Sequence, residues 1–262
     1  MTKSAKKQDK VKKLSANYEL SDKDFIPLPK FIEFKPKNQK QKIAYESIKD
    51  HDINFFVGKV GSGKSTIPTI YAINELLKGN IKKIILIRPA KVDKDEELGF
   101  LKGDLDQKIA PLILPLKSII VEQLSETIFE RMNENKQMQG FSVAHARGMT
   151  FKNSFVIVDE AQNLTRKNLR MLLTRIDDSS KMAICGDLEQ CDLDDFSLSS
   201  FNDIDIFRNE DSINIVEFNS SDVVRGRMTA VVERCYAKLD KVDVINPNKD
   251  NSDFRIYLDN KY

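Results

Sequence analysis

The 262-residue chain has no tryptophan, only two histidines and three cysteines, and no apolar run near the roughly 18 residues that could span a bilayer. The cysteines, Cys185, Cys191 and Cys235, are odd in number and lack metal-ligand spacing. We therefore expect free thiols in a reducing, cytoplasmic compartment rather than a disulfide framework or a zinc site. No apolar stretch follows the basic N-terminus, so neither a secretory signal nor a membrane partner is expected.

A strong net charge is also lacking, since 42 basic and 40 acidic residues leave only +2. The distribution is uneven, because residues 1–49 hold 13 Lys and six acidic residues. A basic arm of this kind can hold a phosphate backbone electrostatically. A Lys-rich stretch can equally be a solvated tail, and for residues 1–20 both interpretations stay open.

Short apolar runs alternate with helical stretches along the centre of the chain. The pattern predicts strands at 54–57, 84–87, 142–144, 155–158, 182–185 and 213–218, and helices at 38–50, 64–77, 104–131, 166–175 and 227–239. Strands that are apolar throughout are buried on both faces, so an α/β fold with a mainly parallel sheet between two helical layers is predicted. We expect this domain at residues 31–240, after a flexible basic segment (1–30) and before a tail or edge strand (241–262).

The most specific motif is Gly58-Lys59-Val60-Gly61-Ser62-Gly63-Lys64-Ser65, which reads G-x4-G-K-S. It stands between a predicted strand and a predicted helix, as a phosphate-binding P-loop requires. Glycines let the backbone wrap so that N–H groups point at phosphate oxygens, and the helix adds its positive end. The sequence therefore predicts that this loop binds ATP with Mg²⁺. We expect Lys64 at the β- and γ-phosphates, Ser65 on Mg²⁺ and Thr66 near the α-phosphate.

Two acids, Asp159 and Glu160, directly follow the apolar run 155–158. Carboxylates beside a core are costly unless they have a partner, and Mg²⁺ would supply one. Asp159 is predicted to hold the ion through its water shell, and Glu160 to orient or deprotonate the attacking water.

The run 182–185 ends in Gly186-Asp187-Leu188-Glu189-Gln190. An Asp-Glu pair is typical of P-loop proteins with an extra strand between the P-loop strand and the acidic strand, and 182–185 is the candidate. Gln190 would then sense the γ-phosphate, unless it is a loop residue without a role. His145 could act as a switch, but a single histidine near a strand is more often structural.

Further blocks accompany these motifs: Arg88–Ala90, Leu98–Leu105, Arg147–Phe151, Val158–Asn163, Leu173–Ile176, Gly186–Gln190 and Asp222–Arg225. Together they resemble the PhoH-like family of phosphate-starvation-inducible ATPases and, more distantly, the first motor domain of superfamily-one helicases. The resemblance covers roughly residues 36–240 and implies a RecA-like P-loop NTPase. The chain departs from the family pattern at Lys102 and Met149, after Arg225, and in the serines of the P-loop.

The resemblance also implies roles for residues outside the two main motifs. Gln39 would contact adenine, Arg225 would face the γ-phosphate, and Arg88 and Arg147 would lie near the nucleotide or the nucleic-acid path. The implied activity is ATP hydrolysis coupled to binding or remodelling of RNA or single-stranded DNA, as in a helicase. A helicase encloses ATP between two motor domains and this chain has room for one, so a homo-oligomeric ring such as a hexamer is expected, with Arg225 acting in trans.

Two other functions stay open at this point. An ATP-gated switch or stress adaptor that acts on a protein partner would use the same P-loop. A small-molecule kinase is less favoured, because no arginine-rich lid is visible and Glu160 as a water activator suits hydrolysis better.

Overall fold

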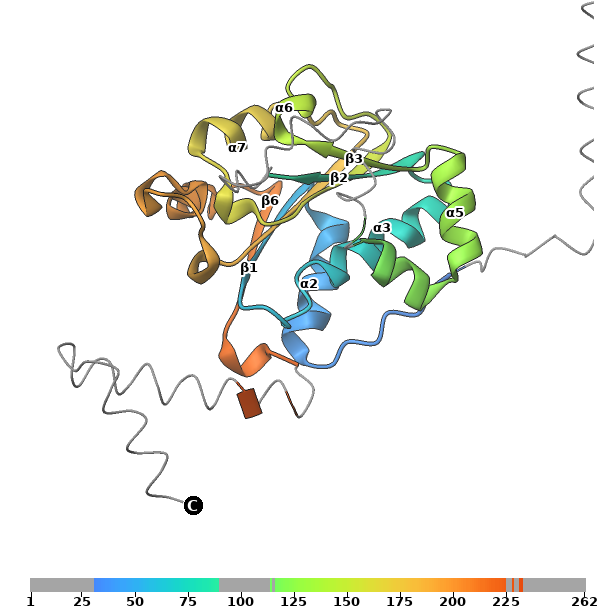
Figure 1. The fold of residues 1–262 in the computed structure, drawn as a ribbon, viewed down its shortest axis with the longest axis horizontal. Helices are drawn as coiled ribbons and strands as arrows, with labels where there is room; N and C mark the ends of the chain where they lie inside the picture. Colours follow the sequence, from blue (N-terminus) through green and yellow to red (C-terminus); the bar gives the residue numbers. More distant parts are fainter. Residues whose placement is uncertain (1–30, 90–113, 115, 225–227, 229–230, 233–262) are drawn as a thin grey trace, which may run out of the picture.

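The computed structural model describes residues 31–89, 114, 116–224, 228 and 231–232 (Figure 1). The predicted terminal segments 1–30 and 241–262 lie outside the described residues, as do Arg225 and Cys235. The same holds for the first part of the helix expected at 104–131 and for nearly all of the helix expected at 227–239.

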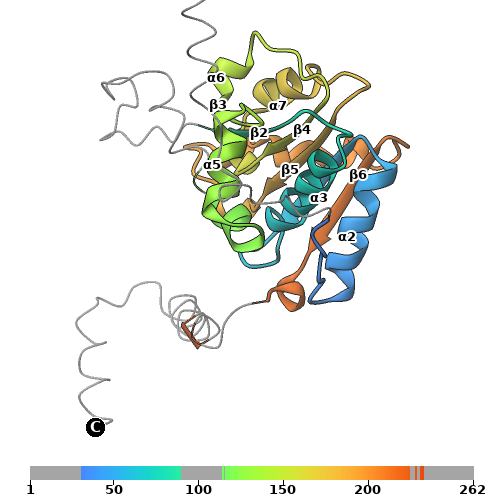
Figure 2. The ribbon, with the colours of Figure 1, turned by 90° about the vertical axis from the view of Figure 1, so that its right-hand side faces the viewer.

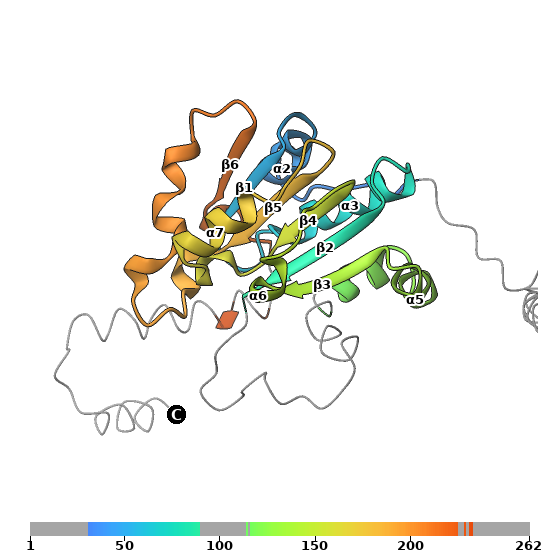
Figure 3. The ribbon, with the colours of Figure 1, turned by 90° about the horizontal axis from the view of Figure 1, so that it is seen from above.

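Six strands form one all-parallel sheet in the order β3-β2-β4-β5-β1-β6 (Figure 3). The strands are β1 (Ile53–Gly58), β2 (Lys83–Arg88), β3 (Met138–Ser142), β4 (Ser154–Val158), β5 (Lys181–Gly186) and β6 (Ile213–Phe218). The five predicted apolar runs in β1, β2, β4, β5 and β6 are confirmed. β5 pairs with both β1 and β4, so the predicted extra strand between the P-loop strand and the acidic strand is confirmed as well.

The strand predicted at residues 142–144 is wrong. The strand ends at Ser142, and Val143–Ala146 forms the short helix α6. β3 lies at the edge of the sheet, and in its sequence MQGFS only Met138 and Gly140 are buried. An edge strand of this kind has no continuous apolar run by which the sequence could reveal it.

Helices cover both faces of the sheet (Figures 1 and 2). On one face lie α2 (Gln39–Asp50), α3 (Thr66–Leu77), a helical segment at 116–123 and α5 (Glu126–Glu134), around a buried cluster that includes Ile48, Ile73 and Phe155. On the other face lie α6, α7 (Arg166–Leu173) and the 3-10 segment η6 (Ser200–Phe207), around a second cluster. The predicted three-layer α/β sandwich is confirmed, and it is the RecA-like fold of P-loop NTPases.

The parallel arrangement brings the functional segments to one edge. The glycine loop follows β1, Arg88 ends β2, Asp159 follows β4 and Asp187 follows β5. In parallel sheets, ligands bind at the carboxyl ends of the strands. The candidate site therefore lies at this edge of the sheet.

Candidate nucleotide-binding site

The loop after β1 has a backbone that only glycine adopts without strain. Gly58, Gly61 and Gly63 have φ angles of +145°, +84° and +93°. A Cβ atom on Gly58 would lie 2.3 Å from the carbonyl oxygen of Phe218, and one on Gly63 would lie 2.9 Å from the amide nitrogen of Gln41. The motif thus forms a tight turn into α3, as the sequence predicts, with space that a side chain would fill.

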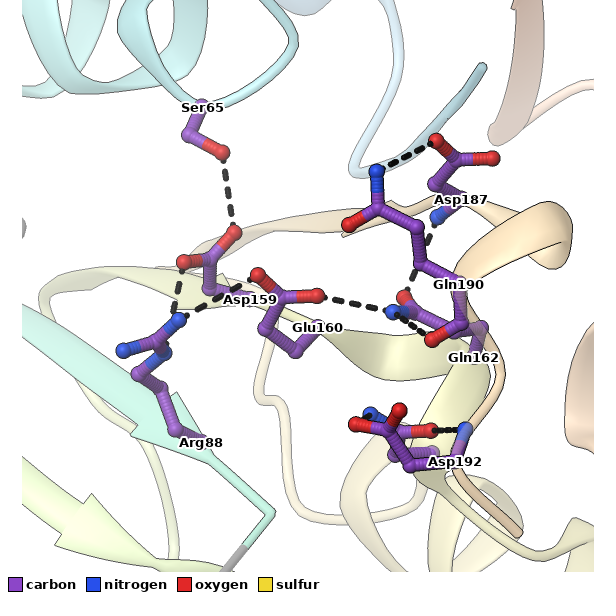
Figure 4. A network of polar contacts seen from close by, with 9 residues as sticks. Ser65, Arg88, Asp159, Glu160, Gln162, Asp187, Gln190 and Asp192 are labelled. Carbon is purple, nitrogen blue, oxygen red and sulfur yellow. Dashed lines mark hydrogen bonds and ion pairs between the residues drawn. The ribbon is translucent and has the colours of Figure 1, made fainter. Parts of the chain in front are cut away.

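Ser65 links this loop to the acidic strand. It stands at the N-cap of α3 but makes no side-chain cap bond. Its hydroxyl instead donates to Oδ1 of Asp159 at 2.8 Å (Figure 4). A hydroxyl and a carboxylate are the hard oxygen donors that Mg²⁺ prefers. Among the described residues no group of three or more His, Cys, Asp or Glu could hold a metal ion.

Arg88 bridges the two acids. Its Nε lies 3.4 Å from Oδ2 of Asp159, and its Nη2 lies 3.3 Å from Oε1 of Glu160. Burial raises the pKa of Asp159, and the Arg88 guanidinium and the Ser65 hydrogen bond offset only part of this effect. The guanidinium of Arg88 thus lies between the two carboxylates and contacts both.

Glu160 adopts a left-handed backbone conformation with φ +54°. Such a conformation is costly for a residue other than glycine, and strain of this kind gathers at functional sites. The carboxylate is fixed on its second side by Gln162, whose Nε2 donates to Oε2 at 2.7 Å. The strained turn thus presents a carboxylate that two neighbours hold in place.

Gln162 is a buried member of this network that the sequence analysis did not single out. Its side chain is fully buried and joins three segments. Nε2 donates to Glu160 and to the carbonyl oxygen of Gln190 (3.1 Å), while Oε1 accepts from the backbone N–H of Asp187 (3.1 Å) (Figure 4). The only signal was its place in the Val158–Asn163 block, which carried the family resemblance.

A cleft of about 810 Å³ opens beside these groups. Asp159 and Glu160 line it, together with six predicted loop residues: Val60, Gly61, Gly63, Lys64, Ser65 and Thr66. Val224 closes one side, and its N–H donates to the carbonyl oxygen of Gly61 at 3.0 Å. The opposite wall comes mainly from the extended segment 31–37, which we call the strap.

The strap is fastened to α3 by Asn74. The N–H of Ile32 donates to Oδ1 of Asn74 at 2.8 Å, and Nδ2 of Asn74 donates back to the carbonyl oxygen of Ile32 at 2.9 Å. The ring of Phe34 stacks on Tyr45 of α2 with centroids 4.5 Å apart. The wall of the cleft is thereby attached to both helices that flank the glycine loop.

Gln39, which the family resemblance places at the nucleotide, does not line the cleft, and Gln41 lies there instead. Gln39 is exposed and does not line the cleft, whereas Gln41 lines it and is only 5% exposed. Gln41 accepts from the N–H of Lys37 and donates to the carbonyl oxygen of Ser62, both at 2.8 Å. The reason is helical phase, since Gln41 shares the buried face of α2 with Ala44 and Ile48.

Other predicted residues lie apart from the cleft. Gln190 is not among its lining residues, and its amide donates to Oδ2 of Asp187 at 3.2 Å. The ammonium of Lys59 lies 2.9 Å from Glu189, and Arg147 is exposed at the end of α6. Arg225 itself lies outside the described residues, although its neighbour Val224 lines the cleft.

Comparison with known proteins now adds to this geometry. The sequence profile of the family described as PhoH-like protein matches residues 33–237. The chain belongs to the PhoH-like family. It is 37% identical over 210 residues to a PhoH-like protein of Bacillus subtilis, covering 80% of this chain and 65% of that protein. A PhoH-like protein of Synechocystis sp. is 34% identical over 77% of this chain and 62% of its own length.

This PhoH-like chain thus spans about three fifths of the length of the curated relatives it matches. Among solved structures, the large terminase of a thermophilic bacteriophage in complex with ADP gives a TM-score of 0.46 at 12% identity, over 75% of this chain and 49% of the terminase. Pif1 helicase from Candida albicans gives a TM-score of 0.32 at 11% identity, over 71% of this chain and 41% of the helicase. No helix in the described parts of the chain is long and apolar enough to cross a membrane.

Proposed function

We propose that this PhoH-like protein binds ATP with Mg²⁺ in the cleft and hydrolyses it, in a cycle coupled to RNA or single-stranded DNA. The observation that carries the proposal is the meeting of Ser65 and Asp159 at 2.8 Å beside the glycine loop, with Glu160 adjacent. An ordinary turn would give no reason to place a strained carboxylate and a buried one at the same point.

The phosphates would lie on the loop and the first turn of α3. Backbone N–H groups of Gly61 to Thr66 and the ammonium of Lys64 would bind them. All of these residues except Ser62 line the cleft, which supports this role. The adenine would lie toward the strap, where Gln41 takes the role expected of Gln39. Gln41 keeps one amide hydrogen and one oxygen lone pair beyond its two hydrogen bonds within the chain.

Ser65 and Asp159 would hold Mg²⁺, which when bound neutralises charge on the β- and γ-phosphates. Glu160 would orient a water molecule and take up its proton as the water oxygen attacks the γ-phosphorus and the bond to the β-phosphate oxygen breaks. Arg88 and Gln162 would keep the carboxylate of Glu160 in position during this step.

We further propose that the protein works as a homo-oligomeric ring, such as a hexamer, in which Arg225 of one subunit acts at the ATP of its neighbour. One motor domain supplies one wall of an ATP site, and an arginine in trans typically accelerates hydrolysis by about 10³–10⁵-fold. Head-to-tail contacts of this kind close into a ring when the rotation between neighbouring subunits allows it. Mass measurement in solution tests the assembly, and a fully active monomer would contradict it.

The central test is an ATPase assay with and without single-stranded RNA and DNA at low salt. Wild-type protein should hydrolyse Mg-ATP and be stimulated by at least one polymer. Lys64→Ala should lose binding or hydrolysis, whereas Glu160→Gln should bind ATP and trap it. Normal hydrolysis by Glu160→Gln would remove the water-activating role. Hydrolysis that responds only to a protein partner would favour the ATP-gated switch instead.

A further inference from the structure

The helices α6 and α7 carry basic residues and no acid of their own, while the acids Asp203 and Asp205 lie on the neighbouring η6. Between residues 136 and 176 the chain carries seven Lys and Arg residues but only two acids, Asp159 and Glu160. Both acids face the cleft, where Arg88 binds them. The helices α6 and α7 pack against each other on the face of the sheet opposite to α2 and α3 (Figure 1).

The first turn of α7 carries positive charge at a cost to the stability of the helix. Leu169 and Leu172 form the buried side of α7. The first turn of the helix carries Arg166 and Lys167 and no acidic residue. Cations near a helix N-terminus oppose the helix dipole, and like charges three or four residues apart repel. Arg170 stands three residues after Lys167 and four after Arg166, so both repulsions are present.

Local ion pairs account for Arg166 but not for the other two cations. Arg166 donates to both carboxylate oxygens of Asp203 at 2.7 Å each, and the next acid of η6, Asp205, binds Arg208 at 2.6 Å. Among the residues that the structure describes, Lys167 and Arg170 are exposed and form no ion pair. Arg147, at the end of the neighbouring α6, is exposed in the same way.

We propose that Lys167 and Arg170, flanked by Arg147, form a binding surface for the phosphodiester backbone of a single-stranded nucleic acid. Residues three apart on a helix have Cβ atoms about 5–6 Å from each other, so the two cations can each contact one of two successive phosphates. Neither α6 nor α7 carries an acid that would repel the strand, and Asp203 of the neighbouring η6 is already paired with Arg166. Charge complementarity thus selects a polyanion that passes over the helix.

The position of this surface in the chain suggests how binding of the strand would affect the ATP site. The inference rests on the proposed function. α7 follows directly on the short segment Ala161–Asn163, in which Gln162 holds Glu160 and the loop after β5. Lys167 stands five residues and Arg170 eight residues after Gln162, so a strand bound to them lies close along the chain to the residue that positions the proposed water activator.

The test uses the full chain and labelled RNA and DNA oligonucleotides of about 20 nucleotides, titrated at several salt concentrations. The double variant Lys167→Gln/Arg170→Gln should bind at least about 10-fold more weakly than wild type. The slope of log K against log salt should fall by about 0.7 for each phosphate contact removed, or about 1.4 in all. The matched control is Lys78→Gln/Lys82→Gln, which removes two exposed cations between α3 and β2, at the amino ends of the strands, and should bind as wild type does.

Folding is checked by a second variant, Lys167→Glu, which places an acid in the first turn of α7. Its melting temperature should equal or exceed that of wild type while its affinity falls, a combination that unfolding cannot produce.

If wild type binds and the α7 variants bind as the control does, the proposed surface is wrong and the proposed function stands. If wild type binds neither polymer at about 50 mM salt, the nucleic-acid part of the proposed function fails together with the surface. The RNA and DNA arms show which polymer is preferred.

Discussion

Replacement of Gln162 by leucine should separate catalysis from nucleotide binding. The change removes three hydrogen bonds, of which the one to Oε2 of Glu160 is charge-assisted. A hydrogen bond to a charged group contributes about 1.5–3 kcal/mol, which corresponds to roughly 10- to 150-fold in rate if it is needed only in the transition state. We expect kcat for ATP to fall about 10- to 100-fold.

The KM for ATP should change less than about 3-fold, because Gln162 does not line the cleft. Stability should also fall, by about 2–4 kcal/mol, since the N–H of Asp187 and the carbonyl of Gln190 lose their buried partner. Steady-state kinetics at saturating Mg²⁺ and denaturant unfolding measure the two effects.

Asn163→Leu is the matched control for this variant. The side chain of Asn163 also holds the loop after β5, through two hydrogen bonds with Asp192, but it forms none with Glu160. The backbone N–H of Asn163 donates to the carbonyl oxygen of Glu160 at 3.0 Å, and the substitution keeps this bond. Its kcat should stay within about 3-fold of wild type although some stability is lost. Should Gln162→Leu keep wild-type kcat, or lose only ATP affinity, the positioning of Glu160 by Gln162 would be refuted.

Three further outcomes are expected. Gly63→Ala should abolish ATP binding, measured by titration calorimetry, because φ is +93° and the new Cβ would lie 2.9 Å from the Gln41 amide. Gln41→Ala should raise the KM for ATP about 10-fold, the loss of about 1.4 kcal/mol of hydrogen bonding, whereas Gln39→Ala should change it less than 2-fold. Burial raises the pKa of Asp159, so its ionisation costs folding free energy. The metal-free protein should therefore lose stability as pH rises above about 4, and Asp159→Asn should reduce that loss in thermal unfolding; an unchanged pH dependence would contradict this origin.

The parts of the site that the sequence revealed are those whose reasons are local. The glycine loop is visible because its backbone can only be made by glycines at that spacing, and the acidic strand because two carboxylates follow an apolar run. The order of β1, β5 and β4 was also predictable, since the Asp159–Glu160 pair is typical of one P-loop class.

What the sequence concealed depends on contacts between distant segments. Gln162 meets Gln190 across 28 residues, and Arg88 meets Glu160 across 72, so neither role has a local signature. The sequence could have shown that Gln41, and not Gln39, faces the cleft, because Ala44 and Ile48 mark the buried side of the same helix. β3 was hidden because an edge strand needs little apolar sequence.

The two opposed hydrogen bonds between Ile32 and Asn74 give the protein a mechanical property. Asn74 belongs to the helix whose first turn continues from the glycine loop, and the lysine-rich residues 3–13 precede the strap in the chain. Tension on the chain ahead of residue 31 would therefore be transmitted to α3 rather than absorbed by a loose connection. Any load on these lysines would therefore act on the loop that is proposed to bind the triphosphate.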